Sequence, residues 1–171
     1  AVKHGINMIL TPLWTPPLDT AVGGERPTVQ LLEISEKDGK YEFDFSRLAK
    51  WIEVAKRVGV EYFEMSHFFS QWGAKFSPKI IVNGEKRFFW HTEALSDEYQ
   101  DFLKQLIPQL TAFLAGKNLQ KQCYFHISDE PSLEMLDNYK GAAELVTNLL
   151  GDLEAWPIID ALTSPEYYDM G

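Results

Sequence analysis

The sequence predicts an α/β fold in the form of a partial (β/α)8 barrel. Short apolar runs alternate with helical patterns along the chain, and this alternation implies parallel strand pairing. The segments that follow predicted strands are long and aromatic, at 11–45 and 66–95, whereas those that follow predicted helices, such as 116–121, are short. This asymmetry is typical of barrels, because their sites form at the carboxyl ends of the strands. A doubly wound sheet obeys the same rule, but no glycine-rich phosphate loop follows the first strand.

Buried strands are predicted where short apolar runs are bounded by turn residues. They cover residues 6–10, 60–65, 123–127 and 157–162. A hairpin is predicted inside each long loop, because Asp38-Gly39 and Asn83-Gly84 are strong turn signals. The hairpin arms are 29–34 with 41–45 and 79–82 with 86–90.

Three helices are predicted from apolar residues at helical spacing. They cover residues 46–58, 96–114 and 132–150. Ser46 and Ser96 are good N-caps, and Gly59 and Gly151 are good terminators. Pro108 is expected to bend the second helix or to limit it, because proline removes a backbone donor.

The predicted elements amount to about half of a barrel, which normally takes roughly 250 residues. The 171 residues, 45% of them apolar, support one domain with a substantial core. We therefore expect residues 1–171 to form a single domain that is a fragment of a catalytic barrel. Its open sheet edges require cover from another part of the protein or from a second copy.

Composition excludes several classes of function. A net charge of −9 argues against nucleic acid as a partner, and no run is apolar enough to cross a bilayer. The single cysteine, Cys123, excludes an internal disulfide and is expected to pack in a strand. The scattered histidines show no metal-ligand spacing, so neither metal nor cofactor is expected. No signal peptide is found at the start of the sequence. Because residue 1 is Ala, however, this says little about the cellular compartment, for which we make no prediction.

The stretch from His126 to Pro131 is the strongest functional signal. The apolar run there ends in two adjacent acids, Asp129 and Glu130. Acid catalysis on a glycosidic bond needs a carboxyl group at a rigid strand end. Both side chains reach one pocket only if the chain already turns at that point, which Pro131 favours. The alternative interpretation is that Asp129 caps the following helix.

Further candidate substrate-binding residues lie at predicted strand ends or in the long loops. They are His67, Trp72, Trp90, His91, Trp14 and Tyr167. Aromatic faces stack on sugar rings, and a few polar groups among aromatics are typical of a ligand site. For each of these residues, a role in packing is the competing interpretation.

Residues 124–131 resemble the Asp-Glu motif of the glycoside hydrolase family 123 catalytic domain, and 8–13 and 63–68 are also similar to that group. The resemblance spans most of the chain in order. It implies a bacterial protein with a (β/α)8 barrel, usually behind a β-sandwich domain, that removes β-linked N-acetylgalactosamine. It also implies substrate-assisted catalysis, in which Asp129 holds the substrate acetamide and Glu130 protonates the leaving oxygen.

Two alternatives stay open at this point. In a retaining barrel glycosidase, Glu130 is the acid/base, and the nucleophile lies on a strand missing from this sequence. In a non-catalytic relative, the barrel binds glycans without cleaving them. In each case we expect a glycan partner, together with the remaining half-barrel or a β-sandwich domain of the same protein.

Overall fold

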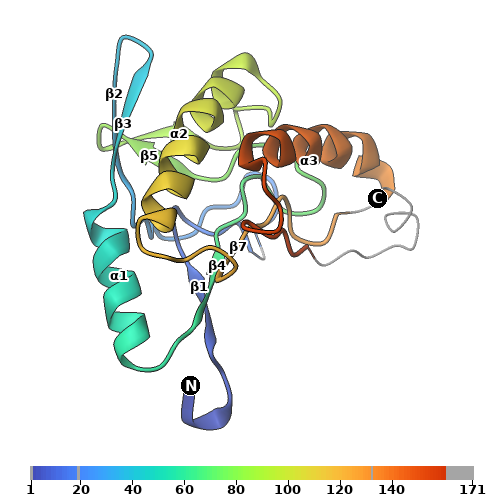
Figure 1. Ribbon diagram of the computed structural model, residues 1–171. Coiled ribbons are helices and arrows are strands. Elements are labelled where there is room, and N and C mark those ends of the chain that lie inside the picture. Colours follow the sequence, from blue (N-terminus) through green and yellow to red (C-terminus); the bar gives the residue numbers. More distant parts are fainter. Residues whose placement is uncertain (1, 19, 132, 161–171) are drawn as a thin grey trace.

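A three-stranded parallel sheet lies at the centre of the fold. The fold comes from a computed structural model, which describes residues 2–18, 20–131 and 133–160. The strands are β1 (Met8–Thr11), β4 (Tyr62–Met65) and β7 (Cys123–Tyr124), in the order β1-β4-β7 (Figure 1). A fourth segment continues this order, since Phe125 forms a parallel bridge with Ile158. Neighbours in the sheet therefore follow the order of the chain.

Helices separate the parallel strands along the chain. They are α1 (Ser46–Arg57), α2 (Asp97–Ala115) and α3 (Leu136–Leu150), with short 3-10 turns at Val2–His4 and Leu133–Met135. α2 and α3 contact each other and lie together in Figure 1. Pro108 lies inside α2 without ending it. The buried apolar face of α2 offsets the hydrogen bond that proline cannot donate.

Both predicted hairpins form, but the first arm of the first one lies at Glu33–Lys37 and not at the predicted 29–34. The first pairs β2 (Glu33–Lys37) with β3 (Lys40–Asp44), and the second pairs β5 (Ile80–Val82) with β6 (Glu85–Phe88). Their turn residues all have positive φ: 53° and 77° at Asp38-Gly39, and 53° and 80° at Asn83-Gly84. Asn83 also joins the two hairpins, because its N–H donates to the Ile34 carbonyl at 3.0 Å.

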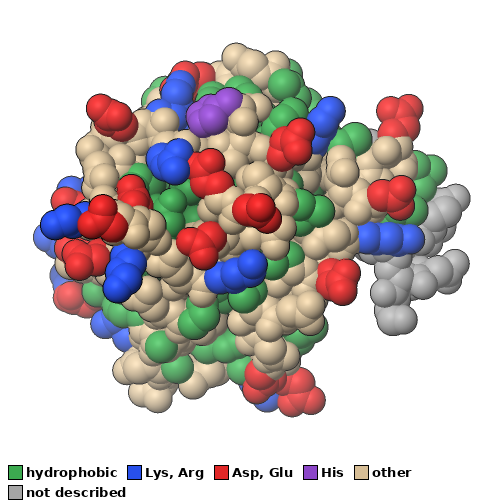
Figure 2. Space-filling view, turned by 90° about the horizontal axis from the view of Figure 1, so that it is seen from above, with side chains coloured by type: hydrophobic (Ala, Val, Ile, Leu, Met, Phe, Trp, Pro, Cys, Tyr) green, Lys and Arg blue, Asp and Glu red, His purple; other side chains and the backbone are tan. Residues whose placement is uncertain are grey.

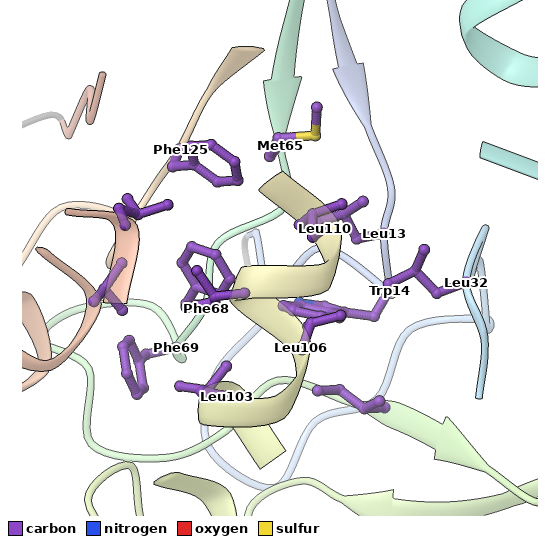
Figure 3. Packing of buried hydrophobic residues seen from close by; sticks show 14 of the residues in the cluster. Leu13, Trp14, Leu32, Met65, Phe68, Phe69, Leu103, Leu106, Leu110 and Phe125 are labelled. Atoms are coloured by element: carbon purple, nitrogen blue, oxygen red, sulfur yellow. The ribbon is translucent and has the colours of Figure 1, made fainter. Parts of the chain in front are cut away.

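The core packs around α2 and includes side chains from the segments that follow the parallel strands. Leu103, Leu106 and Leu110 of α2 lie among aromatic side chains that follow the parallel strands (Figure 3). Trp14 follows β1 and Phe68 follows β4, and their ring centroids are 5.9 Å apart. The segments that leave the carboxyl ends of β1 and β4 are thus anchored to the same helix.

These elements confirm the predicted α/β class, while the finer prediction of a partial (β/α)8 barrel remains a prediction. Cys123 is buried, as expected. The predicted start of the third helix is wrong: α3 begins at Leu136, after a 3-10 turn. The last predicted strand pairs at Ile158, and its final residues, 161 and 162, lie outside the described residues.

The molecular surface carries both signs of charge. On the face shown in Figure 2, acidic and basic side chains are interspersed rather than gathered into a field of one sign. None of the described helices combines the length and the apolar character needed to span a bilayer.

Candidate functional site

The chain bends sharply just beyond β7, at residues 128–130, which we call the acid corner. Glu130 has φ of 43°, a left-handed conformation that is uncommon outside glycine. Ser128 is buried, Asp129 is half-buried and Glu130 is exposed. The residue that precedes α3 as its N-cap is Met135. The alternative prediction that Asp129 caps this α-helix is therefore wrong.

A loop after β4 holds the acid corner from one side. The backbone N–H of Trp72 donates to the Asp129 carbonyl at 2.7 Å, and those of Gly73 and Ala74 donate to the Ser128 hydroxyl at 3.1 and 3.2 Å. The Ser128 hydroxyl in turn donates to the Ser70 carbonyl at 2.8 Å. These bonds place Trp72, which is 42% exposed, directly beside Asp129.

A buried carboxylate holds the same corner from the other side. Asp160, just beyond the fourth parallel segment, accepts the backbone N–H groups of Ile127 at 3.1 Å and of Ser128 at 3.4 Å. It also accepts the Tyr139 hydroxyl of α3 at 2.7 Å. With a side chain only 3% exposed, Asp160 joins β7, α3 and the acid corner.

His126 lies between two carboxylates. Its Nδ1 is 3.1 Å from Asp160, and its Nε2 is 3.1 Å from Glu64 of β4. Burial alone would lower the pKa of His126, but the hydrogen bonds with Asp160 and Glu64 outweigh it and raise the pKa to about 9. The hydrogen bond from His126 likewise lowers the pKa of Glu64, against the effect of burial. His126 is thus a buried imidazolium at neutral pH.

His67 stacks on that imidazolium, with ring centroids 4.2 Å apart. Burial, and then the charge of His126, lower the pKa of His67 to about 4, so this ring is neutral. Its Nδ1 is buried and has no hydrogen-bond partner among the described residues. The His67 carbonyl accepts the Trp14 indole N–H at 2.9 Å.

The remaining predicted residues lie in different surroundings. Trp14 is completely buried, so its ring offers no surface to a ligand, and its position supports the packing interpretation. Trp90 donates its indole N–H to the Gly24 carbonyl at 2.7 Å, and it lines a small hollow with neighbouring prolines. His91 is exposed, with Nε2 at 3.1 Å from the Arg87 carbonyl. Tyr167 lies outside the described residues.

Sequence reasoning missed several residues of this site, namely Glu64, Ser128, Tyr139 and Asp160. Two of them, Glu64 and Asp160, could have been recognised from the sequence, because they are acids inside predicted apolar strands. Such acids are rarely buried without a partner, and His126 is the partner here. Glu64 and Asp160 approach opposite nitrogens of this ring, so the three side chains do not converge on one point as metal ligands would.

Comparisons with known proteins found a matching family model and a solved structure of similar fold. The model of the "Glycoside hydrolase 123, catalytic domain" family matches residues 1–170. Among solved structures, a family 123 glycoside hydrolase from Clostridium perfringens, studied for glycolipid glycan hydrolysis, has a TM-score of 0.59 at 16% identity. That match covers 82% of this chain and 25% of the other, and at this identity it shows a shared fold. No curated protein sequence matches the chain. Residues 1–170 therefore belong to the catalytic domain of glycoside hydrolase family 123.

Proposed function

We propose that the protein is a glycoside hydrolase that releases β-linked N-acetylhexosamine, foremost N-acetylgalactosamine, by a substrate-assisted retaining mechanism. Family membership and the glycolipid glycan hydrolysis named for the Clostridium perfringens relative support a glycan substrate. One observation carries the assignment of residues: Asp129 and Glu130 leave the sheet together at a left-handed corner beside an exposed indole.

The proposed reaction uses one acid and one orienting carboxylate. The acetamide oxygen of the substrate attacks the anomeric carbon, while Asp129 accepts the acetamide N–H and strengthens the oxygen as a nucleophile. Glu130 donates its proton to the leaving oxygen as the glycosidic bond breaks. The Glu130 carboxylate then takes a proton from a water molecule, which opens the cyclic intermediate and restores the starting state.

This mechanism explains why the two acids can be neighbours. An enzyme with a protein nucleophile places its two carboxyl groups about 5–5.5 Å apart across the bond. When the substrate supplies the nucleophile, no second carboxyl across the bond is needed, so the acid and the group that holds the acetamide can be neighbours in the chain. On a regular strand, adjacent side chains point to opposite faces. The left-handed φ at Glu130 marks a turn of the chain, which supports the proposal that both acids serve one site.

The proton donor also needs surroundings that keep it protonated. A carboxyl group remains protonated near neutrality beside an apolar wall or a second negative charge. We propose that Asp129 supplies this charge in the complete site. Because Glu130 is exposed in this chain, we propose that the wall comes from the rest of a (β/α)8 barrel, of which residues 1–171 are one part. The chain-ordered parallel segments support this proposal.

Trp72 is the proposed stacking platform for the sugar. Trp72 is 42% exposed, and its backbone N–H is bonded to the Asp129 carbonyl, so its backbone is held beside the acid corner. Trp90 and His91, on the segment after β6, remain proposed glycan contacts because aromatic side chains stack on sugar rings. His67 is buried and stacks on the His126 ring, so we propose that it supports the site from behind that ring and does not touch the sugar.

The decisive experiment combines an inhibitor with a variant of the intact protein. A thiazoline analogue of N-acetylgalactosamine, which mimics the cyclic intermediate, should inhibit competitively. Glu130→Gln should lower kcat by about 10²- to 10⁴-fold on substrates with poor leaving groups, and by less when the leaving group needs no proton. Glu134→Gln is the matched control, because Glu134 is an exposed acid four residues further along.

Other outcomes would identify the alternatives. Turnover of sugars that lack an acetamide, without inhibition by the thiazoline, would favour a retaining glycosidase with a protein nucleophile. Binding to glycans without turnover on any of them would favour a non-catalytic relative. Full activity of Glu130→Gln would remove the proposed proton donor.

A further inference from the structure

We propose that Asp160 is the positioning residue of the acid corner, which it holds through the backbone amides of Ile127 and Ser128. This inference rests on the proposed function, because it assigns Asp160 a role that reaches the reacting bond through Glu130. Asp160 itself need not touch the substrate.

The carboxylate of Asp160 directs its bonds to the segment that leads into the acid corner. Oδ1 accepts from the Ile127 N–H at 3.1 Å and pairs with His126 Nδ1 at 3.1 Å. Oδ2 accepts from the Ser128 N–H at 3.4 Å and from the Tyr139 hydroxyl at 2.7 Å. Three consecutive residues, His126 to Ser128, are thus bonded to one buried group.

Ser128 also connects the acid corner to a second support, the loop after β4. The Ser128 hydroxyl binds the N–H groups of Gly73 and Ala74, so Asp160 and the loop after β4 meet at Ser128. Glu130 follows two residues later, in a conformation that its own backbone does not favour. A strained conformation persists only where its surroundings over-determine it, and Asp160 supplies that restraint from the neighbouring strand.

Charge keeps Asp160 in place. Its side chain is 3% exposed, and an unpaired buried carboxylate would be costly. The His126 ring pairs with Asp160, and Glu64 of β4 and His67 beyond β4 lie against that ring. The Tyr139 hydroxyl of α3 donates to Asp160 itself. Replacing the carboxylate by an amide should therefore disturb both the charge of His126 and the amides of the corner.

The test is Asp160→Asn in the intact protein, because the side chain keeps its size and loses its charge. We expect kcat to fall by about 10- to 100-fold, the loss caused by small misplacement of a catalytic group, while KM stays within about threefold. Amide hydrogen exchange at Ile127 and Ser128 should accelerate, and the pKa of His126, followed by NMR, should fall. If Asp160→Asn does not fold, Tyr139→Phe should show the same changes to a smaller degree.

Asp152→Asn is the matched control. Asp152 also accepts two backbone N–H groups, those of Glu154 and Ala155 at 3.0 and 3.1 Å, but it is exposed and lies after α3. We expect this substitution to leave kcat unchanged and the exchange of Ile127 and Ser128 unaltered.

A double variant separates positioning from a general structural role. If Asp160 acts through Glu130, then Asp160→Asn together with Glu130→Gln should be no slower than Glu130→Gln alone. Independent losses that multiply would overturn the proposal, as would unchanged exchange at Ile127 and Ser128. Full activity of Glu130→Gln alone would instead refute the proposed proton donor. Amide exchange at Ile127 and Ser128 in Asp160→Asn would still show whether Asp160 holds the acid corner.

Discussion

The pair of hairpins and the acid corner extend from the same small sheet, but they are specified in different ways. Each hairpin turns at a residue pair with positive φ, and the second residue of each pair is glycine. At the acid corner and in the loop after β4 that holds it, positive φ falls on Glu130, Trp72 and Ala74, none of which favours it. The hairpin turns are therefore encoded locally, whereas the corner is imposed by distant parts of the chain.

The hydrogen bonds follow the same division. Hairpin pairing joins residues close in sequence, such as Lys37 with Lys40. Ser128 binds Ser70, 58 positions earlier, and Asp160, 32 positions later. A corner held by such long-range bonds can position side chains that a tight turn could not, but it depends on the whole fold being formed.

The largest difference between the two regions should appear when alanine replaces a glycine in each. At Gly73, with φ of 131°, a Cβ would lie 2.1 Å from the Met135 Cβ, so the loop or the start of α3 must move. We expect Gly73→Ala to cost about 4 kcal/mol or more in the free energy of unfolding, measured by denaturant titration.

Gly84→Ala is the comparison in the hairpin. With φ of 80° and nothing within 4 Å of the added Cβ, it should cost about 1 kcal/mol, from backbone strain alone. Equal losses in the two variants would mean that the loop after β4 does not pack on residue 135 as described.

A serine substitution sharpens the comparison at the level of hydrogen bonds. Ser128→Ala removes one acceptor for two buried N–H groups and one donor to a carbonyl. We expect a loss of about 2–4 kcal/mol, because buried polar groups left unpaired are costly, together with lower kcat. Ser35→Ala, on the exposed face of β2, should change stability by less than about 0.5 kcal/mol. A stable Ser128→Ala protein with full activity would show that the loop and the corner hold each other by other means.

The two stacked histidines should make stability depend on pH in opposite directions. The pKa of His126 rises from 6.5 to about 9 on folding, so its contribution is complete below pH 6.5 and is lost as pH rises through 9. The pKa of His67 falls from 6.5 to about 4, so its contribution is present above pH 6.5 and is lost as pH falls toward 4.

The free energy of unfolding should therefore be greatest near pH 6.5 and lower by about 2–3 kcal/mol toward either pH 4 or pH 9. Denaturant titrations across this range would measure it. His126→Gln should flatten the alkaline side while Asn83→Ala, in the hairpins, should leave the shape of the curve unchanged. Stability that rises between pH 7 and 9 in the parent protein would contradict a buried imidazolium at His126.

Periodicity and turn chemistry predicted most of the elements. The apolar stripe of α2 and the Asp38-Gly39 and Asn83-Gly84 turns are local signals, and the helix and both turns form where they were expected. The first arm of the first hairpin was placed too early, because only the turn, and not the start of the arm, has a local signal. The start of α3 was not predictable in this way, because Pro131 suggests a helix start. In the structure, the left-handed Glu130 and a 3-10 turn delay that start to Leu136.

For the proposed site, the sequence singled out two candidate acids but not the residues that hold them. The adjacent pair Asp129 and Glu130 stands out because it follows an apolar strand directly. Trp14 resembled a ligand-binding aromatic equally well, and only its burial in the core around α2 shows that it packs there. Pattern analysis cannot separate a buried aromatic from an exposed one when both follow strands.

The sequence by itself determined the α/β class, the two hairpins and the place of the two acids at the end of a strand. Each depends on residues close together in the chain, through helical spacing, strand length or the φ preference of a turn. The tertiary structure decided the bend at Glu130, the charge of His126 and the contacts of Asp160. Those properties depend on contacts between strands and helices far apart in the sequence, and they exist only when those elements pack together.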